Sequence, residues 1–96
     1  MSVLVLVDLK PNAEDVQPMI DYIKEVISGT RGFDGCQDIN VYLEDNGERI
    51  VMVEHWDSKS HYEKYVAWRT ETGVMDKLGA MLAEAPIFRF ADNTGA

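Results

Sequence analysis

The chain has 96 residues, with 17 acidic and 9 basic side chains and a formal net charge of −8 at pH 7. This length allows one domain, placed at residues 1–96, and the acidic balance argues against binding to nucleic acid or to an anionic membrane. The single cysteine, Cys36, cannot form a disulfide within the chain, which fits a reducing compartment. The amino terminus lacks a basic region, and its apolar run is too short to span a bilayer. These features predict a cytoplasmic protein.

The first half of the chain predicts a strand, a helix and a second strand. Residues 3–9 are apolar at every position but one, as in a strand that is buried on both faces. After a turn at "KPN", apolar residues recur at helical spacing over residues 16–27, and Pro18 is comfortable only in the first turn of that helix. The glycine-rich "SGTRGFDG" ends the helix. Residues 37–44 then alternate between apolar and polar side chains, as in a half-buried strand.

The second half predicts a hairpin, two helices and a final strand. Asn-Gly within "EDNGE" is a strong signal for a hairpin turn, and residues 49–56 form the strand after it. Ser58 can cap the next helix, and after Gly73 a third helical stripe runs until Pro86. "IFRF" is the fourth strand, and residues 92–96 form a polar tail that we expect to be flexible.

The element order β-α-β-β-α-α-β predicts an α+β fold of the ferredoxin-like split βαβ type, with a four-stranded antiparallel sheet. Its helices would cover only one face of that sheet. Because the strands at residues 3–9 and 50–53 are apolar on both faces, the other face would carry a large apolar patch. We expect a second copy of the chain to cover this patch in a homodimer packed sheet to sheet. The alternative is a monomer with an apolar open face.

A candidate site lies in the stretch "IVMVEHWDSKSHYEKY", where the third strand meets the second helix. Alternate residues of a strand share a face, so Met52, Glu54 and Trp56 point the same way. Tyr62 and Tyr65, three residues apart, share the helix face that looks back at the sheet. Together these side chains would form an aromatic-walled pocket with one carboxylate, suited to a flat aromatic ligand. The alternative is an ordinary aromatic core, although a carboxylate on a core strand needs a partner or a chemical role.

Other kinds of site fit the sequence poorly. His55 and His61 are six residues apart across a strand–helix junction, whereas two metal ligands on one helix face would be four apart. We therefore expect no bound metal. Cys36 has no basic neighbour in sequence that would activate it as a nucleophile. The GxxxxGK[ST] pattern of a phosphate-binding loop does not occur in the sequence.

Three segments of the sequence resemble those of a known family: the opening strand, "GC" at residues 35–36, and above all "IVMVEHWDSKSHYEKY". The family is that of the antibiotic biosynthesis monooxygenases, which are dimeric α/β barrels, and the last segment is similar to that of bacterial quinol monooxygenases. The resemblance covers nearly the whole chain. It implies a homodimer with a pocket between sheet and helices in each subunit. It also implies that dioxygen oxidises a phenolic or quinol substrate with no metal, flavin or other cofactor.

The resemblance further implies roles for individual residues. Members that act on aromatic polyketides use a Trp at the end of the third strand and a Tyr six residues later, which are the positions of Trp56 and Tyr62. The Asn that those enzymes carry four residues before the Trp is replaced here by Met52. Many members have a His where this chain has Tyr65. The haem-degrading branch uses a Trp at that position and a His ten residues on, which is Met75 here, so the haem ligand is missing.

From residues and resemblance together we predict a cofactor-independent monooxygenase that oxidises a small aromatic quinol or polyphenol with dioxygen. Trp56 would contact the substrate, Tyr62 would carry a proton, and Glu54 would accept the phenolic proton or anchor that network. The remaining pocket residues are Met52, Tyr65 and Trp68. The alternative is a non-catalytic dimeric ligand-binding or stress-response module on the same fold, because a fold alone does not fix a function. A third possibility is an isomerase or decarboxylase with Glu54 as its base.

Overall fold

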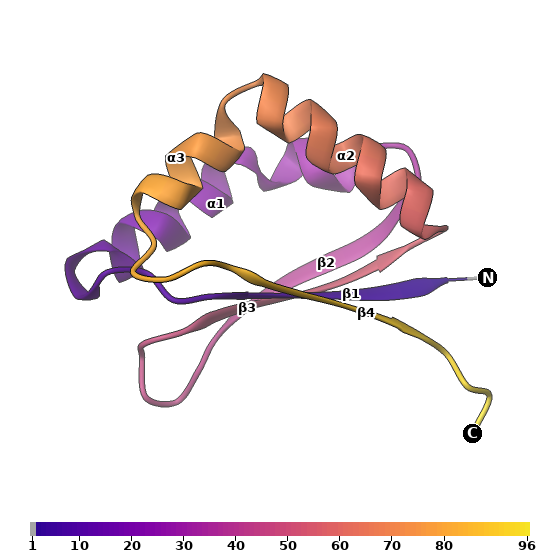
Figure 1. Cartoon of the computed structure of the whole chain (residues 1–96), viewed down its shortest axis with the longest axis horizontal. Coiled ribbons are helices and arrows are strands. Elements are labelled where there is room, and N and C mark those ends of the chain that lie inside the picture. Colours follow the sequence, from indigo (N-terminus) through magenta and orange to yellow (C-terminus); the bar gives the residue numbers. More distant parts are fainter. Residues whose placement is uncertain (1) are drawn as a thin grey trace.

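The computed structural model describes residues 2–96, which form one four-stranded sheet with three α-helices packed on one of its faces (Figure 1). The sheet order is β2-β3-β1-β4, and every neighbouring pair is antiparallel. The strands are β1 (Val3–Leu9), β2 (Cys36–Leu43), β3 (Ile50–Trp56) and β4 (Ile87–Asp92). The helices are α1 (Val16–Arg31), α2 (Lys59–Glu71) and α3 (Val74–Ala80), with a 3-10 turn at Ala13–Asp15 before α1. The predicted α+β, ferredoxin-like fold is confirmed.

Local sequence signals explain most of the helix boundaries. Pro18 is the third residue of α1, where its missing N–H would have no partner within the helix anyway. The Ser58 hydroxyl accepts a hydrogen bond of 3.2 Å from the His61 backbone N–H, so this residue caps α2 as predicted. No helix within residues 2–96 is long and apolar enough to cross a membrane.

The third helix is shorter than its apolar pattern predicts. It ends at Ala80, so Met81 and Leu82 lie beyond its last residue. The Met81 carbonyl accepts a hydrogen bond of 2.8 Å from the Asn12 backbone N–H, and Leu82 forms an isolated bridge with Pro11. These contacts anchor the chain after α3 to the loop after β1, and they take the place of a further helical turn.

Burial alternates along the two central strands and defines the two faces of the sheet. In β1 every second side chain, from Val3 to Leu9, is buried beneath the helices, and the residues between them are half-buried on the opposite face. In β3 the buried residues are Ile50, Glu54 and Trp56, again on the helix side. The even-numbered residues of β3 therefore face the helices, as the two-residue period predicts.

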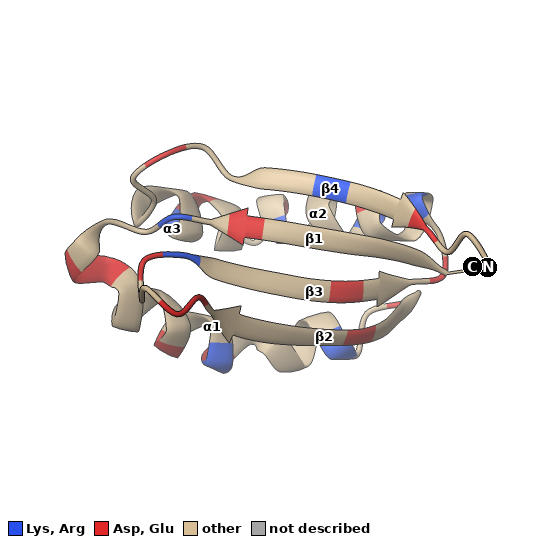
Figure 2. Cartoon of the chain, turned by 90° about the horizontal axis from the view of Figure 1, so that it is seen from below, with Lys and Arg blue, Asp and Glu red and all other residues tan. Residues whose placement is uncertain are grey.

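The opposite face of the sheet has no helix over it, and few charged residues interrupt its strands (Figure 2). By alternation this open face carries mainly apolar side chains, among them Leu4, Leu6, Tyr42, Val51, Val53 and Ile87. Tyr42 is 56% exposed and Ile87 41% exposed. Polar residues border this apolar centre, with Asn40 beside Val53, Arg89 beside Leu6, and Arg49 paired with Asp8 at 2.8 Å. The open face is thus the apolar patch that the strand composition predicts.

The outer strand β4 is the least protected element of the sheet. It pairs only with β1, and all six of its residues are exposed. Phe88 and Phe90 stand opposite Val7 and Val5, so their rings lie on the helix side of the sheet. The Phe90 ring meets Tyr62 edge-on at a centroid distance of 5.7 Å. Through these two rings, β4 reaches the space beneath α2.

A glycine before β2 fixes the start of α2. Gly35 has φ +92°, in the left-handed region that favours glycine, and its carbonyl accepts a hydrogen bond of 2.8 Å from the Asp57 N–H. A Cβ atom added to Gly35 would lie 2.5 Å from the Cβ of His61 in the first turn of α2. The chain therefore passes directly against the helix that carries Tyr62 and Tyr65.

Candidate active site

A cavity of about 390 Å³ lies between the helices and the sheet. Met52 and Glu54 from β3 and Tyr62 and Tyr65 from α2 all line it, which are four of the six residues that the sequence placed in one pocket. Most of the remaining wall is aliphatic and comes from other elements, including Val7, Leu9, Ile23, Ile27, Val74 and Leu78. This volume is in the range of small-molecule sites in proteins.

Glu54 is the carboxylate in this wall, and it is 2% exposed. Burial raises its pKa from 4.5 to about 7, although the hydrogen bond from Trp56 acts in the opposite direction. Among residues 2–96, no Lys, Arg or His side chain lies within 4 Å of it to form an ion pair. Near neutral pH this carboxyl group can therefore both accept and release a proton.

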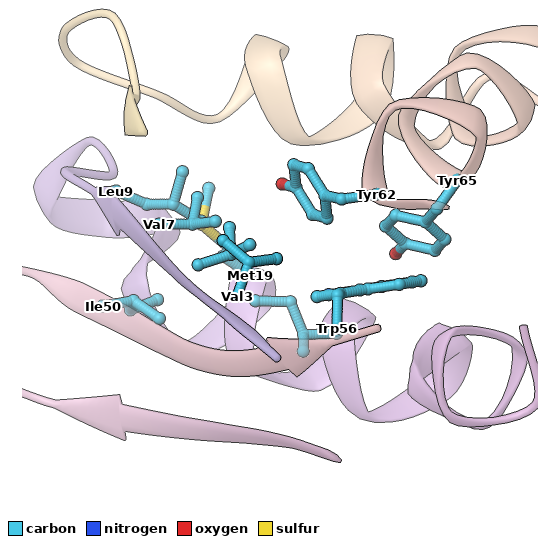
Figure 3. Close-up of a cluster of buried hydrophobic side chains, with 10 residues drawn as sticks. Val3, Val7, Leu9, Met19, Ile50, Trp56, Tyr62 and Tyr65 are labelled. Atoms are coloured by element: carbon cyan, nitrogen blue, oxygen red, sulfur yellow. The ribbon is translucent and has the colours of Figure 1, made fainter. Parts of the chain in front are cut away.

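Trp56 supports the site from behind the cavity wall. Its side chain is 0% exposed, and its indole Nε1 donates a hydrogen bond of 3.0 Å to Glu54 Oε1. Its ring packs edge-on against Tyr62 at a centroid distance of 5.4 Å and lies 5.0 Å from the ring of Tyr65 (Figure 3). Trp56 does not line the cavity, and its hydrogen bond to Glu54 is what connects it to the wall.

The two tyrosines of α2 project toward the strands, yet their hydroxyl groups differ (Figure 3). The Tyr65 hydroxyl is held by Thr30 Oγ1 at 2.7 Å and by Arg69 Nε at 3.0 Å. The Tyr62 hydroxyl takes no part in the hydrogen bonds within residues 2–96, and it points toward Val7 and Leu9, which also line the cavity (Figure 3). Burial raises the pKa of Tyr62, followed by the charge of Glu54 and the nearby Tyr65. Tyr62 therefore keeps its proton at neutral pH and can donate a hydrogen bond into the cavity.

Trp68, which the sequence assigns to the same pocket, does not line this cavity. Its ring stacks on Phe33 at a centroid distance of 5.3 Å, with the Arg69 guanidinium 4.5 Å and the Tyr65 ring 6.2 Å from its centroid. One helical turn therefore separates two environments, with Tyr65 against the cavity and Trp68 against the loop after α1.

The histidines and the cysteine lie outside the cavity wall. His55 points to the open face of the sheet, where its Nδ1 lies 2.8 Å from Asp38 Oδ1. His61 Nδ1 lies 2.6 Å from the Ser58 hydroxyl in the first turn of α2. Burial raises the pKa of Cys36, and the charges of Glu54 and Asp38 add to this effect. Within residues 2–96, no three His, Cys, Asp or Glu side chains are grouped as in a metal site.

Two polar residues of the site region were not predicted from the sequence. Thr30 is 3% exposed and Arg69 5% exposed, and both bond to the Tyr65 hydroxyl. Arg69 follows Tyr65 by four residues, a spacing that places both on one helix face, and this was the available signal for its position. Nothing in the sequence connects Thr30 with α2, because its hydrogen bond with Tyr65 joins residues that are 35 positions apart.

Comparison with known proteins places the chain in a family. The sequence model described as "Antibiotic biosynthesis monooxygenase" matches residues 2–70, which include Glu54, Tyr62 and Tyr65, and the chain belongs to this family. Among curated proteins, none matches the chain at a significant level.

Several solved structures share the fold at low sequence identity. A conserved protein from Methanosarcina mazei Go1 is 20% identical with a TM-score of 0.89, covering 98% of this chain and 94% of that one. Rv0793 from Mycobacterium tuberculosis is 17% identical with a TM-score of 0.86, covering 97% and 95%. A monooxygenase from the gene ActVA-Orf6 of Streptomyces coelicolor, solved in complex with the ligand nanaomycin D, is 15% identical with a TM-score of 0.83, covering 99% and 89%. At these identities the likeness shows the fold, while the family itself is one of monooxygenases.

Proposed function

We propose that the protein is a cofactor-independent monooxygenase of the quinol or polyphenol type. The observation that carries this proposal is a buried carboxyl group, Glu54, in a mainly apolar and aromatic cavity, with its pKa raised to about 7 by burial. A phenol bound beside such a group can lose its proton to it near neutral pH. The low polarity of the wall favours a neutral aromatic ring over a sugar or a phosphate ester.

The reaction needs no electrons other than those of the substrate. Glu54 accepts the phenolic proton, and the resulting phenolate gives one electron to dioxygen, which produces a phenoxyl radical and superoxide. These combine at a ring carbon to form a hydroperoxide, which loses water and leaves a new carbonyl oxygen. A dihydroxybenzene and dioxygen thus yield a hydroxybenzoquinone and water, with all atoms and electrons accounted for. The cavity contributes by holding the ring and excluding bulk water.

Each aromatic residue takes a distinct part in this scheme. Tyr62, whose hydroxyl faces the cavity, passes a proton to the oxygen that leaves as water and regains one from its surroundings. Trp56 is a positioning residue, since its indole N–H holds one oxygen of the Glu54 carboxyl group. Met52, where relatives that act on aromatic polyketides carry an Asn, supplies apolar contact to the flat face of the ring.

The same proposal includes a homodimer. The open face of the sheet is apolar at its centre, and a monomer would expose it to water. A second copy packed sheet to sheet would cover it, and such interfaces bury roughly 800 Å² on each partner. The cavity lies on the helix side, so each subunit would keep its own site.

A non-catalytic ligand-binding module is the second candidate. The observation that favours it is the complete burial of Trp56, which leaves that ring without access to a ligand. Such a protein would bind aromatic ligands in the same cavity and leave them unchanged.

Oxygen uptake separates the two candidates. Protein treated with a strong chelator is mixed with a panel of hydroquinones and anthrones, and dissolved oxygen and quinone formation are recorded together. The proposal expects one dioxygen consumed per hydroxylated product, no accumulated hydrogen peroxide, and no loss of rate after chelation. Binding of these compounds without oxygen uptake would favour the binding module.

A further inference from the structure

Three polar side chains form a closed cluster at the junction of α1 and α2. Arg69 Nη2 donates to Thr30 Oγ1 at 2.9 Å, Arg69 Nε donates to Tyr65 Oη at 3.0 Å, and these two oxygens lie 2.7 Å apart. Arg69 Nη2 also donates to the Val26 carbonyl at 2.7 Å. We call Thr30, Tyr65 and Arg69 the Arg69 cluster. Two of its members, Thr30 and Tyr65, line the cavity that contains Glu54.

The charge of Arg69 has no carboxylate partner in this cluster. Its side chain is buried, and within residues 2–96 no Asp or Glu oxygen lies within 4 Å of its nitrogens. Buried cations are ordinarily paired with an anion, because an unpaired charge loses its hydration. The chain has 17 acidic residues against 9 basic ones, yet it places none of them here. Instead the guanidinium contacts neutral dipoles and the faces of the Trp68 and Tyr65 rings.

The hydrogen bonds of the cluster limit where the protons of the Thr30 and Tyr65 hydroxyl groups can lie. Arg69 donates to both hydroxyl oxygens, and each hydroxyl has one proton of its own. Only one of those protons can lie in the short contact between Thr30 and Tyr65. When Thr30 donates, the Tyr65 oxygen accepts two hydrogen bonds, one of them from a cation, and its own proton is free to point into the cavity. A phenol polarised in this way is a strong donor to an anionic oxygen.

We propose that the Arg69 cluster is a subsite for a negatively charged oxygen on an aromatic ligand, with Tyr65 as the group that touches it. This inference rests on the proposed function for its cavity, and it adds the class of ligand. The ligand presents a phenolate or enolate oxygen to Tyr65, while a protonated oxygen meets Glu54. The two polar parts of the cavity wall thus have opposite preferences, since Glu54 takes up a proton and the Arg69 cluster holds the negative charge.

A purely structural role predicts something different. If the cluster only joins α1 to α2, its loss changes stability and leaves the ionisation of a bound phenol unaffected. The protonation state of a coloured phenol bound in the cavity therefore distinguishes an anion subsite from a purely structural cluster. Para-nitrophenol suits this purpose because its phenolate absorbs visible light and its ring is too electron-poor to be oxidised easily. The result does not depend on whether the protein is catalytic.

The experiment is a pH titration of bound para-nitrophenol, carried out in Glu54→Gln protein so that the neighbouring carboxyl does not titrate in the same range. The proposal expects the bound probe to ionise at lower pH than the free probe, with the phenolate favoured about ten- to a hundredfold. Tyr65→Phe and Thr30→Val should remove most of this preference, whereas Thr30→Ser, which keeps the hydroxyl, should retain it. Circular dichroism of each variant confirms that it is folded.

Two results would overturn the subsite. The bound probe could ionise at the same pH as the free probe or higher, or Thr30→Val and Tyr65→Phe could leave the phenolate preference intact. Failure to bind the probe at all would also count against it. None of these results tests quinol oxidation itself, which the oxygen-uptake experiment measures in the unmodified protein.

Discussion

The indole N–H of Trp56 donates a hydrogen bond of 3.0 Å to Glu54, two residues earlier on the same face of β3. Both side chains are nearly or fully buried, so the bond is made where water cannot compete with it. It fixes one oxygen of the carboxyl group, and in the proposed function the other oxygen would act on the ligand. Trp56 therefore orients Glu54, which is the only carboxyl group that residues 2–96 contribute to the cavity wall.

Replacing Glu54 by Gln should abolish oxidation and change the pH dependence of stability. The folded pKa of Glu54 is about 7, above its ordinary 4.5, so the folded state favours the protonated form. The cost of ionising this buried group is absent below pH 4.5, grows as pH rises, and is complete above about pH 7. The rise in pKa from 4.5 to about 7 corresponds to a loss of about 3 kcal/mol in the free energy of unfolding. Denaturant unfolding of both proteins at several pH values measures it.

At acid pH the two proteins should be equally stable, and at pH 8 Glu54→Gln should be the more stable by up to about 3 kcal/mol. A constant difference between them across the whole range would contradict the buried position of the carboxyl group.

Replacing Tyr62 by Phe should lower the turnover rate by about 10²- to 10⁴-fold, because the ring remains and only the proton-bearing hydroxyl is lost. Since that hydroxyl makes no hydrogen bond within residues 2–96, the free energy of unfolding should change by less than about 1 kcal/mol. His61→Ala, next to Tyr62 in the chain but outside the cavity wall, serves as the control and should have a much smaller effect on rate. If Tyr62→Phe turned over at the normal rate, Tyr62 would be a core residue without a chemical role.

Replacing Val53 by Asp should break the proposed homodimer. Val53 lies on the open face of the sheet, between Leu6 of β1 and Asn40 of β2. A charge buried there without a partner costs about 3–5 kcal/mol. Sedimentation should then show a species near 10.9 kDa for the variant and twice this mass for the unmodified chain. Ala67→Asp adds the same charge on an exposed part of α2 and should leave the dimer intact.

Replacing Gly35 by Ala should cost more stability than the same change at Gly47. Both glycines have positive φ, +92° and +73°, so both substitutions strain the backbone by about 1–2 kcal/mol. Around Gly47 nothing lies within 4 Å of the added methyl group, whereas at Gly35 it would meet His61 at 2.5 Å. We expect a further loss of about 1–3 kcal/mol at Gly35 as α2 is displaced. Equal unfolding midpoints for the two variants would show that α2 adjusts without cost.

The fold and part of the site could be predicted because they depend on local periodicity. The two-residue period of β3 places Met52, Glu54 and Trp56 on one face, and that holds in any register with its neighbours. How deeply Trp56 lies could not be predicted, because its burial depends on the packing of α2 and of Phe33 over its ring. The cavity wall is thus formed by only part of the face that the period identifies.

The position of Trp68 shows the limit of helical periodicity. Three residues along an α-helix turn the side chain to within about 60° of its starting direction, so Tyr65 and Trp68 share a face only broadly. The distance between α1 and α2 decides which ring enters the cavity, and sequence alone does not give that distance. The bond from Arg69 to Thr30 is of the same kind, since it joins residues 39 apart at a helix crossing.

The edge position of β4 has a consequence for how a ligand enters. Phe88 forms part of the cavity wall, yet its strand pairs only with β1. Edge strands open at a lower free-energy cost than central strands, so the cavity can exchange its contents by brief separation of β4 while β1 and β3 stay paired. Backbone amide hydrogens of β4 should then exchange with solvent deuterium faster than those of β1. An aromatic ligand that contacts Phe88 should slow this exchange, so the outer strand reports occupancy of the site.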